Sequence, residues 1–129
     1  MSRIFVVEPH PDIRSLLEIV IERLGHEAVL PAAGDEGIPD VDAAVVDPDG
    51  AGFVIAQRLR ARRVPTVLTS IFPPERDALD LDPVAYLLKP FPLYALEHAV
   101  TAAVEAGHDP SAGRAQAPPI GAGGTPPNR

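Results

Sequence analysis

The sequence contains no cysteine among its 129 residues. Disulfide bonds, thiolate metal ligands and cysteine nucleophiles are therefore excluded, and stability has to come from packing. Basic residues are also few: 11 Lys and Arg stand against 18 Asp and Glu, which gives a formal net charge of −7. This acidic balance argues against a nucleic-acid-binding surface, which needs clustered basic side chains. The one basic cluster, residues 58–63, is typical of a solvated helix end.

Long apolar runs are absent as well. No stretch approaches the roughly 18 residues that suggest a membrane-spanning helix, and the N-terminus lacks the basic-then-apolar pattern of a signal peptide. We therefore expect a cytoplasmic protein without a membrane partner. Apolar residues nevertheless make up 46% of the chain, which is enough for one domain to bury a core.

The apolar residues follow an alternating rhythm. Continuous apolar runs predict buried strands at residues 4–7, 28–30, 41–46, 64–69 and 84–88. Helical spacing of apolar residues occurs at residues 13–24, 53–62 and 93–106, whereas residues 32–38 are weak and residues 73–79 form a short helix at best. This rhythm predicts an α/β fold with a parallel sheet that is covered on both faces.

The composition changes after Gly107. Residues 108–129 contain five prolines and four glycines, and Ile120 is their only large aliphatic residue. Such a segment cannot bury itself, so we expect one domain at residues 1–107 and a disordered Pro-, Gly- and Ala-rich tail at residues 108–129. A docking peptide and the stub of a linker to an output domain are alternative interpretations of the tail.

Polar residues stand where the predicted strands end. Glu8 follows the first strand and Asp47 the third, Thr69 and Ser70 close the fourth, and Lys89 follows the fifth. In a parallel sheet these ends meet at one edge, where ligands bind. We therefore expect the five side chains to converge there.

These residues, together with Lys-Pro-Phe at 89–91 and Tyr86 before the lysine, resemble the receiver domain of two-component response regulators over about residues 3–106. The resemblance implies a flavodoxin-like (βα)5 fold, a doubly wound parallel sheet with strand order 2-1-3-4-5. It also implies a single-domain receiver in a phosphorelay, which is not an enzyme. The implied partners are a histidine kinase or phosphotransfer protein and an unknown downstream protein.

The resemblance assigns roles to the strand-end residues. Asp47 would accept the phosphoryl group, since a carboxylate is a competent nucleophile. Charge on the transferred group needs a divalent cation, a hydroxyl and an ammonium nearby, and Ser70 and Lys89 match the last two. We prefer Ser70 to Thr69 because it lies five residues after Pro65, the spacing usual in the family.

Two further features follow from the same resemblance. Tyr86 occupies the aromatic position that turns together with the hydroxyl residue, here Ser70, when a receiver switches. The Lys89–Pro90 bond resembles one that is cis in the family, a conformation that proline makes accessible.

The predicted metal site departs from the family pattern. Receivers usually place two consecutive acids after the first strand to hold Mg²⁺ with the phosphoacceptor, and here these positions are Glu8 and Pro9. The implied ligands are Glu8, Asp47 and the backbone carbonyl of Asp49, and Asp12 is a further candidate. Loss of the second carboxylate predicts weak Mg²⁺ binding, or none.

Two alternatives stay open. The segment before residue 41 leaves almost no room for a second helix, and the loop at 47–52 is shorter than usual, so the chain fits a pseudo-receiver that binds a partner without phosphorylation. The Asp-Pro-Asp-Gly sequence at 47–50 also resembles the first motif of haloacid dehalogenase-type phosphatases, with Asp47 as nucleophile and Asp49 as general acid. Such phosphatases have a further acidic motif downstream that completes the metal site, and this sequence has no acidic residue at a strand end after Lys89.

Overall fold

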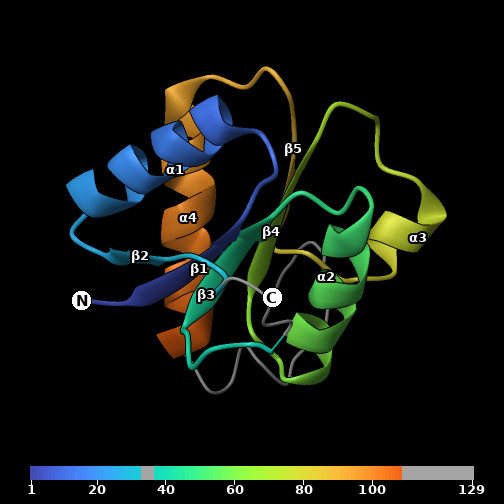
Figure 1. The fold of residues 1–129 in the computed structure, drawn as a ribbon, viewed down its shortest axis with the longest axis horizontal. Coiled ribbons are helices and arrows are strands. Elements are labelled where there is room, and N and C mark those ends of the chain that lie inside the picture. Colours follow the sequence, from blue (N-terminus) through green and yellow to red (C-terminus); the bar gives the residue numbers. More distant parts are fainter. Residues whose placement is uncertain (33–36, 109–129) are drawn as a thin grey trace, which may run out of the picture.

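The computed structural model describes residues 1–32 and 37–108, which form a layered α/β structure (Figure 1). The strands are β1 (Arg3–Val7), β2 (Glu27–Val29), β3 (Ala43–Val46), β4 (Thr66–Ser70) and β5 (Ala85–Leu88). The helices are α1 (Pro11–Arg23), α2 (Ala51–Ala61), α3 (Arg76–Leu79) and α4 (Leu93–His108). Neighbouring strands pair in parallel in the order β2-β1-β3-β4-β5, which confirms the predicted flavodoxin-like, doubly wound sheet.

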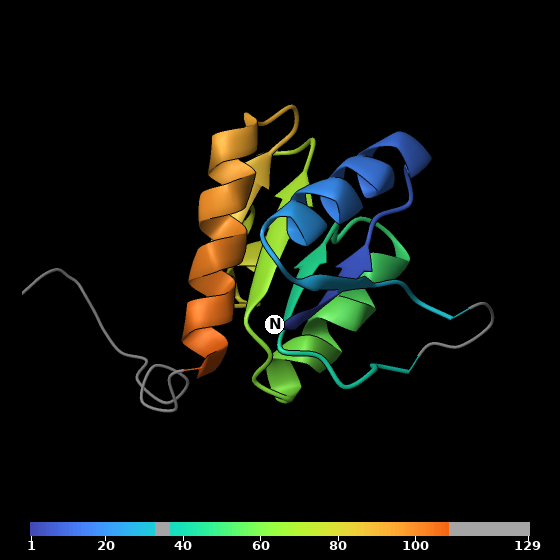
Figure 2. The same ribbon diagram turned by 90° about the vertical axis from the view of Figure 1, so that its left-hand side faces the viewer.

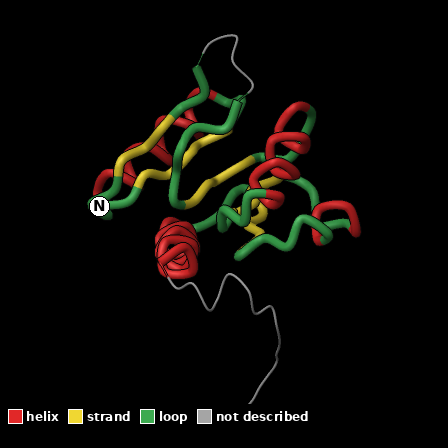
Figure 3. Tube along the Cα trace, turned by 90° about the horizontal axis from the view of Figure 1, so that it is seen from below, coloured by secondary structure: helices red, strands yellow, loops and turns green. Residues whose placement is uncertain are grey.

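Strand residues alternate between the two faces of the sheet, because successive side chains of a strand point to opposite sides. One face packs against α1 and α4 and buries Ile4, Val6, Val45 and Val67. The other face packs against α2 and the region of α3 and buries Phe5, Ala44, Val46 and Leu68. Figure 2 shows α1 and α4 from their own side, and Figure 3 views the molecule from below, nearly along the axis of α4. Burial on both faces explains why the central strands are continuously apolar.

Helix α1 begins at Pro11, three residues after Glu8, which itself follows β1. His10 is its N-cap: the Nδ1 of His10 accepts a hydrogen bond from the Asp12 N–H at 3.2 Å. Pro11 occupies the first turn, where a helix needs no backbone N–H donor. The β1–α1 loop is thereby fixed immediately beside the strand-end residues.

The connection between β2 and β3 departs from the βα rhythm. Its described residues, 30–32 and 37–42, contain no helix. Ile38 and Val41 are instead partly buried against the core on the α2 face. The shortness of this segment predicted the lack of room for a helix.

The element boundaries differ from the predicted ones by a few residues. Strands β3 and β4 both begin two residues later than the apolar runs at 41–46 and 64–69, and β4 extends to Ser70. Of the predicted tail, only His108 is described, as the last residue of α4, and residues 109–129 lie outside the described part. Among the described helices, none combines the length and apolarity needed to cross a membrane.

Candidate functional site

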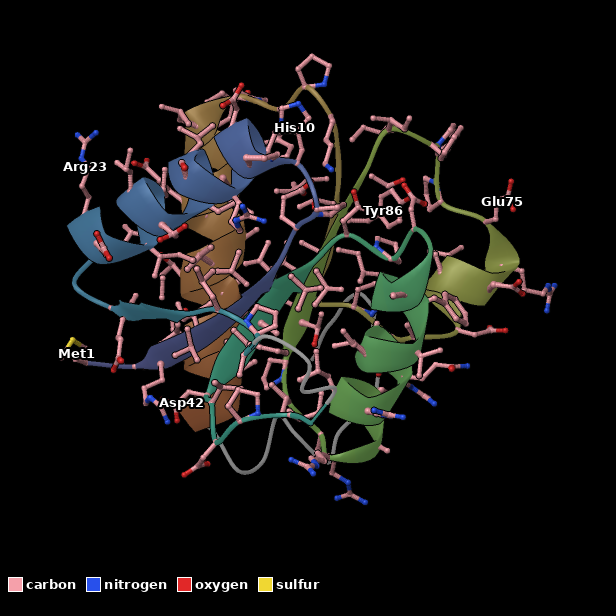
Figure 4. All side chains as sticks on the ribbon, viewed as in Figure 1. Met1, His10, Arg23, Asp42, Glu75 and Tyr86 are labelled. Atoms are coloured by element: carbon pink, nitrogen blue, oxygen red, sulfur yellow. The ribbon has the colours of Figure 1, made fainter. Side chains whose placement is uncertain are left out.

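The carboxyl ends of four strands bring Glu8, Asp47, Ser70 and Lys89 to one edge of the sheet. The strand register aligns these ends: Val7 pairs with Val46, and the Asp47 N–H donates to the Val7 carbonyl at 2.9 Å. On the other side, the Lys89 N–H donates to the Ser70 carbonyl at 2.8 Å. This edge of the sheet lies toward the top of Figure 4, on the side of the labelled His10 and Tyr86. The predicted convergence is therefore present for these four side chains, whereas the prediction was wrong for Thr69, which is buried on the opposite face of β4.

Lys89 joins the two buried carboxylates. Its Nζ lies 2.8 Å from Glu8 Oε1 and 2.5 Å from Asp47 Oδ2. The side chains are 9% (Lys89), 1% (Glu8) and 6% (Asp47) exposed. Burial by itself lowers the pKa of Lys89, but hydrogen bonds and attraction from Asp47 and Glu8 outweigh burial and raise that pKa above its ordinary value. The bond after this lysine, Lys89–Pro90, is cis, which confirms that prediction.

The other carboxylate oxygen of Asp47 is held by the loop that follows it. Asp47 Oδ1 accepts a hydrogen bond from the Asp49 N–H at 2.9 Å. The chain then turns at Gly50, whose φ of 64° is in the region that favours glycine, and enters α2. Both oxygens of Asp47 are thus oriented by neighbouring groups.

Gly52 is a site residue that sequence reasoning missed. A Cβ at this position would lie 1.9 Å from the Asp47 carbonyl oxygen, so only glycine lets α2 approach the strand end this closely. The available signal was a glycine directly before the helix predicted at residues 53–62, close behind the candidate phosphoacceptor.

Asp49 contributes its side chain as well as its backbone. Burial and the neighbouring charge of Asp47 raise the pKa of Asp49, while Lys89 and a hydrogen bond from Ser70 oppose this rise. The side chain nevertheless remains exposed at the edge of the site. The resemblance to receivers predicted only the backbone carbonyl of Asp49 here, whereas the phosphatase alternative gave its side chain the role of general acid.

Ser70 and Tyr86 are connected through the backbone of Phe72. The Phe72 N–H donates to Ser70 Oγ at 3.0 Å, and the Tyr86 hydroxyl donates to the Phe72 carbonyl at 2.6 Å. Thr69 is buried on the opposite face of β4, and its Oγ1 has no hydrogen-bond partner in the described part of the chain. The geometry therefore supports Ser70 rather than Thr69 as the hydroxyl of the site.

A metal ion at this edge of the sheet would depend on two carboxylates, Glu8 and Asp47. Mg²⁺ typically takes one or two protein carboxylates and fills its octahedron with water and phosphate oxygens. Glu8 and Asp47 meet this requirement, because both approach a single point now occupied by Lys89 Nζ. The oxygen donors therefore fit a weakly held Mg²⁺ once the ammonium moves aside.

The other positions considered for metal binding, Asp12 and Pro9, do not point to a third carboxylate at this edge. Asp12 lies exposed in the first turn of α1, where its backbone N–H donates to the N-cap side chain of His10. Pro9 is exposed and offers no carboxylate. Within residues 1–32 and 37–108, no group of three or more acidic, histidine or cysteine side chains is placed to hold a metal ion.

Comparisons with known proteins identify the fold. No protein-family model and no curated protein matches the sequence. Among solved structures, the signal receiver domain of a modulated diguanylate cyclase from Desulfovibrio desulfuricans matches with a TM-score of 0.71 and 25% identity, covering 84% of this chain and 97% of that chain. A CheY-like response regulator receiver domain protein from Methanospirillum hungatei has a TM-score of 0.71 and 17% identity, with 84% and 97% covered.

A third similar structure contains the metal. The receiver domain of a sensor histidine kinase from Pseudomonas aeruginosa, with a magnesium ion coordinated in its active site cleft, matches with a TM-score of 0.66 and 24% identity. The match covers 81% of this chain and 98% of that chain. The chain thus has the architecture of a receiver module. More particularly, its fold is the CheY-like fold of response regulator receiver domains in two-component systems.

Proposed function

We propose that this chain is a phosphorelay receiver in which Asp47 accepts a phosphoryl group from a histidine kinase or phosphotransfer protein. The observation that carries the proposal is the contact between Lys89 Nζ and Asp47 Oδ2 at the edge where four strands end. An ammonium in this position can neutralise charge on the transferred group. The module acts through protein contacts in the cytoplasm, and its net charge of −7 opposes binding to nucleic acid.

The reaction is a displacement at phosphorus. A carboxylate oxygen of Asp47 forms the new bond to phosphorus, while the bond from phosphorus to the donor histidine breaks and its electron pair leaves with the imidazole nitrogen. Lys89 can follow the developing phosphoryl charge, and the Asp49 N–H keeps the carboxylate oriented. A Mg²⁺ held by Glu8, Asp47 and the Asp49 carbonyl would supply further positive charge beside the phosphoryl oxygens.

The Ser70–Phe72–Tyr86 connection provides a route for the signal. A phosphoryl group on Asp47 offers Ser70 a new, charged acceptor, which competes with its present hydrogen bonds. Movement of the Ser70 hydroxyl releases the Phe72 N–H, and the Phe72 carbonyl is the acceptor of the Tyr86 hydroxyl. A change at Asp47 would in this way reach the face of β5.

A second candidate function is a pseudo-receiver that binds its partner without phosphorylation. The observation in its favour is that one ammonium already pairs both buried acids, at a site where Pro9 replaces the second acid. A haloacid dehalogenase-type phosphatase is not favoured, because no acidic residue follows a strand end after Lys89 and the matching solved structures named above are receiver domains.

Nuclear magnetic resonance separates the two candidates. Addition of a small-molecule phosphodonor with Mg²⁺ should shift the amide signals of Asp47, Ser70, Phe72 and Tyr86, and the donor without Mg²⁺ should shift them far less. If the signals stay unchanged at saturating donor and Mg²⁺, the pseudo-receiver is correct and the phosphoacceptor role is not.

A further inference from the structure

Arg14 brings a second cation to the edge of the sheet where Asp47 lies. It belongs to the first part of α1, and its backbone N–H donates to the His10 carbonyl at 2.9 Å. Helical side chains point back toward the N-terminus of their helix, and the Arg14 side chain follows this rule. Its Nη1 donates to the Glu8 carbonyl oxygen at 3.2 Å, which holds the guanidinium beside the end of β1.

Little of the hydrogen-bonding capacity of Arg14 is used in the described part of the chain. A guanidinium has five N–H donors, and the bond to the Glu8 carbonyl takes up one of them. Arg14 is only half-buried and forms no ion pair within residues 1–32 and 37–108. A guanidinium that is held in place but not paired with a carboxylate is available to an anion.

Arg14 and Asp47 line the same cavity, whose volume is about 510 Å³. Pro9 and Asp49 also line it, and Pro9 offers no carboxylate that would neutralise Arg14. A phosphoryl group on Asp47 needs open space, because the Asp47 side chain itself is only 6% exposed. The cavity provides such space, and it brings the guanidinium to the side on which the phosphoryl oxygens can extend.

The charges at this edge of the sheet favour a second cation. The Lys89 ammonium is already shared between Glu8 and Asp47. A phosphoryl group carries up to about two negative charges at neutral pH, so Lys89 would have to serve it together with Glu8. Arginine is always charged, and its planar fork of N–H groups matches phosphate oxygens.

We propose that Arg14 binds the phosphoryl oxygens on Asp47, as a second cation beside Lys89. The inference rests on the proposed function and adds a residue to it. The Arg14 N–H groups donate to the oxygens of the group in transfer, where charge is spread in the transition state. Arg14 forms no covalent bond and transfers no proton, so the displacement at phosphorus is unchanged. Its bond to the Glu8 carbonyl positions the guanidinium before transfer.

The test follows the rate at which a small-molecule phosphodonor with Mg²⁺ labels the full chain, by intact-mass spectrometry. Arg14→Gln should be labelled at least about tenfold more slowly than the parent, the loss expected for a charge-assisted hydrogen bond. Arg14→Lys keeps the charge and should recover part of the rate. The matched control is Arg23→Gln, which makes the same charge change in the last turn of α1, at the end away from His10 in Figure 4. This control should stay within about twofold of the parent.

A second measurement separates phosphoryl binding from mere support of the β1–α1 loop. The Nε–H signal of Arg14 in nuclear magnetic resonance should shift when the parent is labelled, and it should not shift in Asp47→Asn treated with the same donor. This signal is measured without changing Arg14, so it does not depend on how well the Arg14 variants fold.

Four results would overturn the role of Arg14. These are equal labelling rates of parent and Arg14→Gln, equal slowing by Arg23→Gln, no advantage of Arg14→Lys over Arg14→Gln, and an Arg14 signal that stays unchanged in labelled protein. Each of them leaves the labelling of Asp47 intact and refutes this inference alone. A parent chain that is never labelled would instead refute the proposed function, and this inference with it.

Discussion

Lys89→Met removes the one ammonium that lies between Glu8 and Asp47 and should destabilise the fold strongly. At 2.8 and 2.5 Å, each contact has a Coulomb energy of about 6 kcal/mol in an effective dielectric of about 20, opposed by the cost of taking the three groups out of water. Breaking a buried ion pair from one side typically costs about 3–5 kcal/mol. We expect about 3 kcal/mol, the lower end, because the Lys89 side chain keeps 9% of its surface exposed.

Urea denaturation measures this loss as a lower midpoint at an unchanged slope.

The pH dependence of the effect has a defined sign. Since Asp47 and Glu8 raise the pKa of Lys89 in the folded state, the stabilisation by the Lys89 ammonium is complete below pH 10.5 and is lost as the pH rises above that value. The difference between parent and Lys89→Met should therefore shrink only in strong alkali. Mg²⁺ should stabilise the variant more than the parent, because both carboxylates become available to the ion. A loss below about 1 kcal/mol would refute the reasoning, because that is the scale of an exposed ion pair.

The remaining predictions concern three residues around Asp47. Pro9→Asp should tighten Mg²⁺ binding by at least about tenfold, or about 1.4 kcal/mol, in a titration followed by chemical shifts; Pro9→Asn is the uncharged control, and equal affinities of the two variants would contradict the role of charge. Gly52→Ala should cost about 1–3 kcal/mol in urea denaturation, because its Cβ meets the Asp47 carbonyl oxygen, and a gain of about 1 kcal/mol, as in an open helix, would show that α2 is not held there. Asp49→Asn should raise the neutral-pH stability by no more than about 0.5 kcal/mol. Burial and the charge of Asp47 raise the pKa of Asp49 in the folded state, so the parent loses this part of its stability as the pH rises above 3.8, and Asp49→Asn does not. If Asp49→Asn is still more stable than the parent below that pH, the raised pKa of Asp49 is not the reason for the difference.

The sheet could be predicted because its strands are apolar on both faces. A continuously apolar run such as residues 43–46 is typical of a strand that is buried between two helical layers, and the polar residue after each run marks the edge where the strands end. The same pattern explains why Glu8, Asp47, Ser70 and Lys89 could be grouped before any geometry was known.

Features that depend on distances between segments could not be predicted in this way. The close approach of Gly52 to Asp47 and the double pairing of Lys89 arise from the packing of separate elements, and no local pattern encodes them. The cap at His10 was missed because histidine is an unusual N-cap.

Intact-mass spectrometry after treatment with a small-molecule phosphodonor and Mg²⁺ tests the central claim most directly. The parent chain should gain the mass of one phosphoryl group, Asp47→Asn should gain none, and Asp49→Asn, which keeps the phosphoacceptor and the backbone carbonyl, should still be labelled. No mass gain in the parent under any donor or Mg²⁺ concentration, or an equal gain in Asp47→Asn, would contradict the assignment of Asp47 as the phosphoacceptor.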